Sequence, residues 1–93
     1  MTALSVIRGV EIVNRLGLHA RAAVTLVELS NKYEAEITIA RDDLEVNAKS
    51  IMGILMLAAA KGSTIRVRAE GPDAEAAVAA IAELVANRFG EPD

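Results

Sequence analysis

The sequence of 93 residues contains no cysteine and only one histidine, His19. Without thiols the chain cannot form disulfide bonds, thiolate nucleophiles or cysteine-ligated metal sites. One histidine cannot build an ordinary zinc site by itself. Covalent chemistry must therefore use histidine, serine, threonine, lysine, tyrosine or a carboxylate, and we expect no metal and no other cofactor.

Aromatic rings and an excess of positive charge are also lacking. Tyr33 and Phe89 are the only aromatic residues, and the net charge is −3. Nucleic-acid binding relies on clustered basic residues and on stacking platforms, so we expect no nucleic-acid partner. No apolar run is long enough to span a bilayer. The opening residues, MTALSVIRG, lack the layout of a signal peptide, and we expect a cytoplasmic protein without a membrane partner.

The hydrophobic share of 53% is enough for a core in a chain of this length. We therefore expect one ordered domain over residues 1–93. Apolar and polar residues alternate in the stretches predicted as strands, and they recur at helical spacing in the stretches predicted as helices. The predicted strands are residues 4–13, 36–41, 44–48 and 64–70. The predicted helices are residues 20–32, residues 50–60 and a last helix that begins after Asp73.

The predicted order is β-α-β-β-α-β-α. Each strand has one apolar and one polar face, so helices should cover one side of the sheet in a two-layer α/β sandwich. In the uncharged second helix we expect Ile54, Leu57 and Ala58 to face the core and Gly62 to mark the end. We expect Asp73 to cap the last helix.

The stretch NRLGLHARAA, residues 14–23, places His19 at the mouth of the first predicted helix, after a turn that Gly17 permits. A helix N-terminus offers unpaired backbone N–H groups, here those of Ala20 and Arg21, and it favours anions. Neutral imidazole is a competent nucleophile towards phosphorus, and the Arg21 guanidinium would neutralise charge. The alternative is that His19 is an ordinary surface or capping residue.

Three motifs carry a resemblance to a known family: GLHAR, NAKSIMGILMLAAAKGS and AEG. Their order and spacing resemble those of HPr, the histidine phosphocarrier of the bacterial phosphoenolpyruvate-dependent phosphotransferase system, from about residue 6 to residue 88. The resemblance implies an open-faced α+β sandwich with an antiparallel sheet of order 1-4-2-3 and three helices on one side. It implies a carrier that is itself phosphorylated rather than a turnover enzyme.

The resemblance also assigns roles to residues. His19 would accept the phosphoryl group on Nδ1 from enzyme I and pass it to a sugar-specific acceptor, with Arg21 as its cationic neighbour. Ser50 would match a regulatory serine that a dedicated kinase phosphorylates in some bacteria, which adds a kinase, a phosphatase and a transcriptional regulator as partners. The family usually reads H-x-R-P, whereas this chain has Ala22 in place of the proline. We expect a less rigid helix start with the chemistry intact.

Ser50 has a simpler interpretation as well, because a serine directly before IMGILML is a good helix N-cap. The two interpretations are compatible. Phosphorylation would add roughly −1.5 to −2 charges and would obstruct transfer if partners dock on this face.

Apolar residues left over from the core predict a docking surface. Ile51, Met52 and Leu55 lie on another face of the second helix. The resemblance implies docking there, since the family meets its partners with this helix and the first one, where Val24 and Thr25 would complete the surface. The alternative is that the sheet wraps the second helix and buries both faces. Because such a surface suits transient partners, we expect a monomer.

Competing functions remain open. The nitrogen-linked branch uses a carrier that looks much the same. A regulatory protein of the same fold would signal through Ser50, but relatives of that kind lack the histidine. A small α/β module that binds a metabolite or RNA is a third class, and the acidic charge and two aromatic rings argue against RNA.

Overall fold

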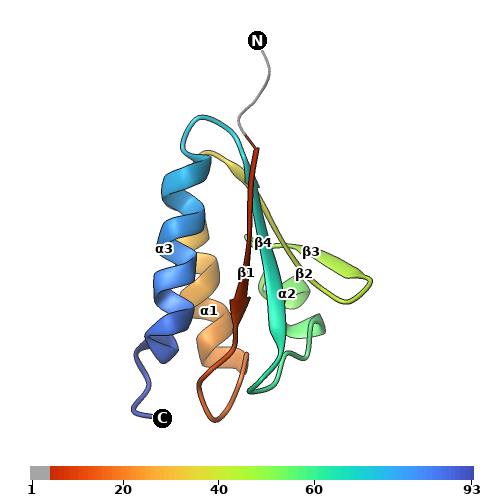
Figure 1. Ribbon diagram of the computed structural model, residues 1–93, viewed down its shortest axis with the longest axis vertical. Coiled ribbons are helices and arrows are strands. Elements are labelled where there is room, and N and C mark those ends of the chain that lie inside the picture. The colour runs from red at the N-terminus through yellow and green to blue at the C-terminus, as the bar shows by residue number, and fades with distance from the viewer. Residues whose placement is uncertain (1–4) are drawn as a thin grey trace.

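The computed structural model describes residues 5–93 and shows a four-stranded sheet packed against helices (Figure 1). The elements are β1 (Ser5–Glu11), α1 (Ala20–Ser30), β2 (Glu36–Arg41), β3 (Leu44–Asn47), α2 (Ile51–Met56), β4 (Thr64–Glu70), α3 (Ala74–Ala86) and a 3-10 turn, η1 (Arg88–Gly90). The predicted order of strands and helices is confirmed. Leu4, at which we predicted the first strand to begin, lies outside the described residues.

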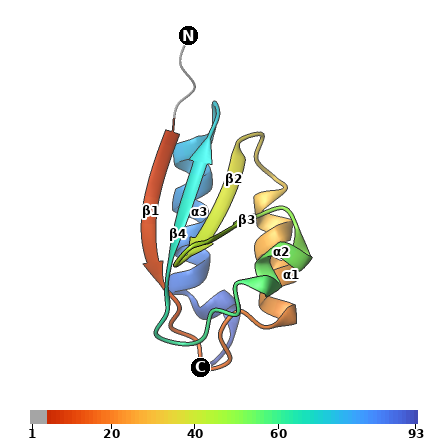
Figure 2. The same ribbon diagram turned by 90° about the vertical axis from the view of Figure 1, so that its right-hand side faces the viewer.

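The sheet is antiparallel with the order β1-β4-β2-β3. Helices α1 and α3 lie side by side on one face, and α2 packs against α1 and β3 at the far edge (Figures 1 and 2). Along β4 the side chains of Ile65, Val67 and Ala69 are buried, whereas Arg66 and Arg68 are exposed. The open-faced sandwich with one solvated sheet face is therefore confirmed.

The core lies between the helices and the covered face of the sheet. Its fully buried large side chains come from every layer: Ile12, Leu26, Ile37, Ile39, Ile54, Leu57, Ile65, Val67, Ile81 and Val85. One face of α1 is buried, and it includes Ser30, whose hydroxyl donates to the Leu26 carbonyl at 2.8 Å. That bond satisfies a polar group that would be costly to bury alone.

Helix α2 is shorter than predicted. It ends at Met56, with Leu57 as its C-cap, and Ala58 then adopts a left-handed conformation at φ +48°. The Arg41 guanidinium donates to the Leu57 carbonyl at 3.1 Å and satisfies the open helix end. The prediction that Ala58 faces the core and that Gly62 ends the helix was therefore wrong. The uncharged run gives no signal for this break, and the bond from Arg41 comes from a distant strand.

Asp73 directly precedes α3, but its carboxylate does not cap that helix as predicted. Both carboxylate oxygens instead accept backbone N–H bonds of 2.9 Å, from Glu34 and from Ala35. The hydrogen bond from Glu34 is the main reason that the pKa of Asp73 lies below its ordinary value. Asp73 thus fastens the start of α3 to the loop before β2. Other predicted boundaries differ by one or two residues, which is ordinary for element ends.

None of the helices within residues 5–93 is both long enough and apolar enough to cross a membrane.

Candidate functional site

The loop between β1 and α1 is held tightly around Gly17. The buried Asn14 side chain donates to the Gly17 carbonyl at 2.8 Å, and the Leu18 N–H donates to the Ala59 carbonyl at 2.9 Å. Gly17 has φ +66°, and a Cβ there would lie 2.6 Å from the Ala59 carbonyl oxygen. Only glycine fits both the left-handed backbone and the close approach. The predicted glycine turn is confirmed, and it fixes the residues that follow.

His19 is the N-cap of α1, directly before the helix rather than inside its first turn. Its backbone is extended at φ −77° and ψ 178°, and its carbonyl accepts the Ala23 N–H at 2.9 Å. The N–H groups of Ala20, Arg21 and Ala22 have no acceptor within the helix, because no residue precedes them by four positions in it. The half-buried imidazole therefore lies beside an open, electropositive helix end.

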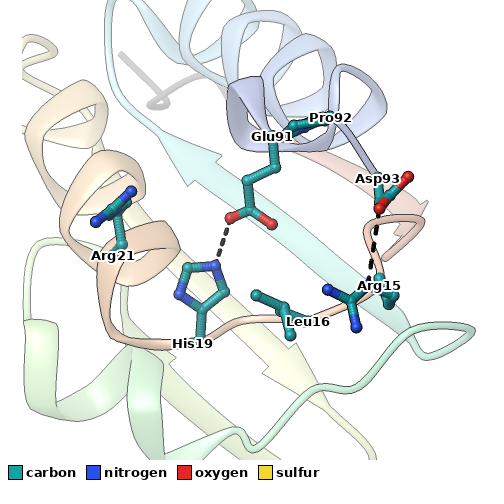
Figure 3. A pocket seen from close by; sticks show the side chains of 7 residues that line it. All are labelled: Arg15, Leu16, His19, Arg21, Glu91, Pro92 and Asp93. Atoms are coloured by element: carbon teal, nitrogen blue, oxygen red, sulfur yellow. Dashed lines mark hydrogen bonds and ion pairs between the residues drawn. The ribbon is translucent and has the colours of Figure 1, made fainter.

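The carboxylate of Glu91, from the C-terminal tail, contacts the imidazole, and sequence analysis missed it. One oxygen of this carboxylate is bonded to Nε2 of His19 (Figure 3). The other oxygen accepts from the Asn14 side chain at 2.9 Å. These partners are separated by more than seventy positions in sequence. No motif predicts the contact, because the stretch EPD matches no pattern that would place it beside His19.

The tail reaches His19 because the chain reverses after α3. Arg88, Phe89 and Gly90 all adopt left-handed backbone conformations, at φ +59°, +55° and +80°. Phe89 is only 8% exposed and belongs to the core. The left-handed conformation is strained for the two non-glycine residues, Arg88 and Phe89, and the burial of the Phe89 ring offsets that strain. The turn thereby places the tail against the loop before α1, where the Asp93 carbonyl accepts the Arg15 N–H at 3.1 Å.

A surface pocket of about 520 Å³ lies beside the imidazole. Its lining residues come from the loop, the start of α1 and the tail: Arg15, Leu16, His19, Arg21, Glu91, Pro92 and Asp93 (Figure 3). The two arginines face two carboxylates, and Arg15 is ion-paired with Asp93 at 3.8 Å. The positive groups left for an incoming anion are therefore Arg21 and the open helix end.

The electrostatics of the pocket favour an ionised Glu91. Burial raises the pKa of this carboxyl, but the hydrogen bonds from Asn14 and His19 and the positive charge of Arg21 outweigh burial, so the pKa lies below its ordinary value. A fixed negative charge therefore lies against Nε2 of His19. Within residues 5–93, no group of three or more histidine, cysteine or acidic side chains is placed to hold a metal ion.

Ser50 is the N-cap of α2, as predicted. Its hydroxyl accepts the Gly53 N–H at 3.1 Å, and its carbonyl accepts the Ile54 N–H at 3.0 Å. Ser50 is half-buried and does not line the pocket beside His19. The structure thus explains the serine by capping alone, and a regulatory role stays a prediction.

The side chains predicted for docking are largely exposed. Met52 is 72% exposed, and Val24, Ile51 and Leu55 are also exposed, on two helices that pack against each other (Figure 2). These four residues are called the helix patch below. Thr25 is half-buried, and its hydroxyl donates to the Arg21 carbonyl at 3.1 Å. The alternative that the sheet buries both faces of α2 is wrong.

Among the other exposed apolar side chains, Leu16 and Met56 reach 59% and 60%, and sequence analysis missed both. Leu16 lies in the loop that carries His19 and lines the pocket. The sequence does not distinguish Leu16 from Leu18, because both are leucines beside Gly17. Only the geometry of the turn shows that Leu16 is exposed and Leu18 is buried.

Comparison with known proteins agrees with this architecture. The family model for the "PTS HPr component phosphorylation site" matches residues 6–87. The chain belongs to the HPr family. Phosphocarrier protein HPr of Cupriavidus necator is 46% identical over 84 residues, which cover 90% of this chain and 94% of that protein. Phosphocarrier protein NPr of Shewanella violacea is also 46% identical over 84 residues, which cover 90% and 92%.

The crystal structure of HPr-C-His from Thermoanaerobacter tengcongensis superposes on this chain with a TM-score of 0.91 at 40% identity, covering 95% of this chain and 99% of that one. The resemblance noted from GLHAR and the two downstream motifs is therefore confirmed. This member of the HPr family is a phosphocarrier of the phosphotransferase system.

Proposed function

We propose that His19 is the residue that takes the phosphoryl group from phospho-enzyme I and passes it to a sugar-specific acceptor. The observation that carries this proposal is the position of the only histidine, half-exposed as the N-cap of α1. A side chain there can meet a donor and an acceptor in turn. The family model for an HPr phosphorylation site, which spans this segment, supports it.

The neighbouring groups suit a transferring phosphoryl group. Phosphoryl transfer depends on positioning and on charge stabilisation more than on covalent help. The backbone N–H groups of Ala20 and Arg21 point out of the helix end, and the Arg21 guanidinium adds a permanent cation. Ala22 adds a third N–H, which the proline usual in the family would lack.

The helix patch is proposed as the surface on which enzyme I and the sugar-specific acceptors dock. Val24, Ile51, Met52 and Leu55 supply exposed apolar area on α1 and α2, and the half-buried Thr25 lies at its border. A few exposed apolar side chains on two helices suit brief association rather than a permanent interface. We accordingly propose a monomer that acts in the cytoplasm, where it would meet these partners.

Regulation through Ser50 is proposed as a second layer. A phosphate on the Ser50 hydroxyl would replace the present bond from Gly53 and would place negative charge next to Ile51 of the helix patch. Partners that approach an apolar surface would then have to desolvate that charge. A Ser50→Asp variant should accept phosphate from enzyme I more slowly than the parent, and an equal rate would contradict the proposal.

The test of the main proposal is intact mass after incubation with phosphoenolpyruvate, magnesium and a bacterial enzyme I. One acid-labile phosphate is expected on the parent and on Ser50→Ala, and none on His19→Ala. Absence of phosphate from the parent, with the same enzyme I active on another carrier, would contradict the proposal. Running the assay in parallel with the enzyme I of the nitrogen branch tests the alternative function, since a phosphocarrier protein NPr is also among the relatives.

A further inference from the structure

We propose that Glu91 is a positioning residue for phosphorylation: its carboxylate keeps a proton on Nε2 of His19, which leaves Nδ1 as the nucleophile, and then balances the positive charge that the ring acquires. The inference rests on the proposed role of His19 as the phosphorylated residue. It assigns a function in the transfer to the C-terminal tail, which is far from GLHAR in sequence.

The contact with Glu91 fixes which nitrogen of the His19 ring carries the proton. A neutral imidazole carries one proton on one nitrogen and a lone pair on the other. An ionised carboxylate accepts hydrogen bonds and does not donate them, so its contact with Nε2 requires the proton to be there. The lone pair is then on Nδ1, on the side of the ring away from Glu91 and towards the start of α1 (Figure 3). Glu91 therefore directs the nucleophilic nitrogen to the open helix end.

The second step is the charge balance of the transfer. The Nδ1 lone pair of His19 forms a bond to phosphorus, while the bond from phosphorus to the donor breaks and its electron pair leaves with the donor. The ring keeps the proton on Nε2 and so becomes positively charged as the bond forms. The Glu91 carboxylate already lies against that N–H, and a prearranged charge of this kind stabilises the transition state without having to reorganise. Onward transfer reverses the same steps.

The third step is that the carboxylate is held in place. Asn14 is fully buried, and its amide donates both to Glu91 and to the Gly17 carbonyl, so one side chain joins the tail to the turn before His19. The left-handed turn at Arg88–Gly90, with Phe89 anchored in the core, returns the tail to this position. Glu91 itself is 18% exposed, much less than the neighbouring Asp93. Together these contacts hold the Glu91 carboxylate against the imidazole.

The decisive comparison uses Glu91→Ala and Glu83→Ala. Glu83 is an exposed glutamate of α3 that does not line the pocket, so it controls for the loss of one negative charge and for the same change of side chain. Nitrogen-15 NMR of the His19 ring, recorded where the ring is neutral, reports the tautomer directly. We expect the proton on Nε2 in the parent and in Glu83→Ala, and an increased share on Nδ1 in Glu91→Ala. Identical ring spectra in the two variants would overturn the proposal.

The second measurement is the rate of phosphorylation by phospho-enzyme I. Glu91→Ala should lower the maximal rate about tenfold relative to Glu83→Ala, the effect of losing one charged hydrogen bond at a partly exposed site. The half-saturating concentration should change little, because Glu91 acts on the ring and not on docking. Glu91→Gln, which keeps an acceptor oxygen without the charge, should recover part of the rate.

Opposite results would be equally informative. If Glu91→Ala is phosphorylated as fast as Glu83→Ala, or faster, the carboxylate is at best a lock on the resting site, and the proposal is wrong. Failure of the parent to be phosphorylated would instead contradict the role of His19. In that case the NMR measurement of the unphosphorylated ring would still show whether Glu91 keeps the proton on Nε2.

Discussion

Replacing Gly17 by alanine tests whether the turn before His19 is as tightly fitted as the structure shows. Two costs add. Alanine at φ +66° pays roughly 1–2 kcal/mol for the left-handed backbone. Its Cβ would also lie 2.6 Å from the Ala59 carbonyl oxygen and 3.0 Å from the Ala60 Cα, so the backbone must move, at roughly 1–3 kcal/mol. Because alanine restricts the unfolded chain more than glycine does, roughly 0.4–1 kcal/mol of this cost is recovered, which leaves a net loss of about 1–4.5 kcal/mol.

The assay is urea and thermal unfolding followed by circular dichroism. For a domain of this size each kcal/mol lowers Tm by about 4–8 °C, so Gly17→Ala should lower Tm by roughly 5–35 °C. Gly62→Ala is the matched control: Gly62 has φ +93°, but a Cβ there meets nothing within 4 Å, so it should cost only about 1 kcal/mol. If Gly17→Ala loses no more stability than Gly62→Ala, the close approach to residues 59 and 60 does not constrain the turn.

Three further predictions concern the cap, the core and the tail. Ser50→Ala should lower the free energy of unfolding by about 1 kcal/mol in urea titration, because the N-cap bond to Gly53 is lost; an unchanged midpoint would refute the capping role. Ile54→Ala should lower the free energy of unfolding by about 2–5 kcal/mol, because Ile54 is fully buried. Met52→Ala should lower it by less than about 0.5 kcal/mol yet weaken binding to enzyme I in calorimetry. Comparable losses of stability in the two variants would refute the assignment of a buried and an exposed face to α2. Because the pKa of Glu91 in the folded protein lies below the ordinary 4.5, its stabilising contribution is present above pH 4.5 and is lost as pH falls through the folded pKa. Stability should therefore decline less steeply below pH 4.5 in Glu91→Gln than in the parent, and equal slopes would show that the carboxylate is unpaired in solution.

The strands and the first helix were predictable from sequence because each has one clear periodicity. In β4 the alternation of Ile65, Arg66, Val67 and Arg68 leaves one arrangement that buries only apolar side chains. In α1 the apolar positions recur at helical spacing and end at Ser30. The position of His19 at the helix mouth followed from the same pattern together with the glycine turn. Local rules were sufficient where one segment buries one face.

Predictions failed where a distant partner decides the local structure. Helix α2 ends early at the left-handed Ala58, where Arg41 of β2 donates to the Leu57 carbonyl, and nothing in the run of uncharged residues marks that point. Asp73 occupies a capping position, but its carboxylate accepts the backbone N–H groups of Glu34 and Ala35 and not those of α3. Glu91 is the most consequential case, since its contact with His19 depends on a left-handed turn at non-glycine residues. Such turns carry no reliable sequence signature.

The central claim is that His19 carries the phosphoryl group on the nitrogen that faces the start of α1. The most direct test is NMR of the protein phosphorylated by enzyme I, with nitrogen-15 in the histidine ring, to detect the coupling between phosphorus and a ring nitrogen. The account predicts one phosphorus bonded to Nδ1 of His19, with the proton retained on Nε2. A phosphorus bonded to Nε2, or to any residue other than His19, would contradict it.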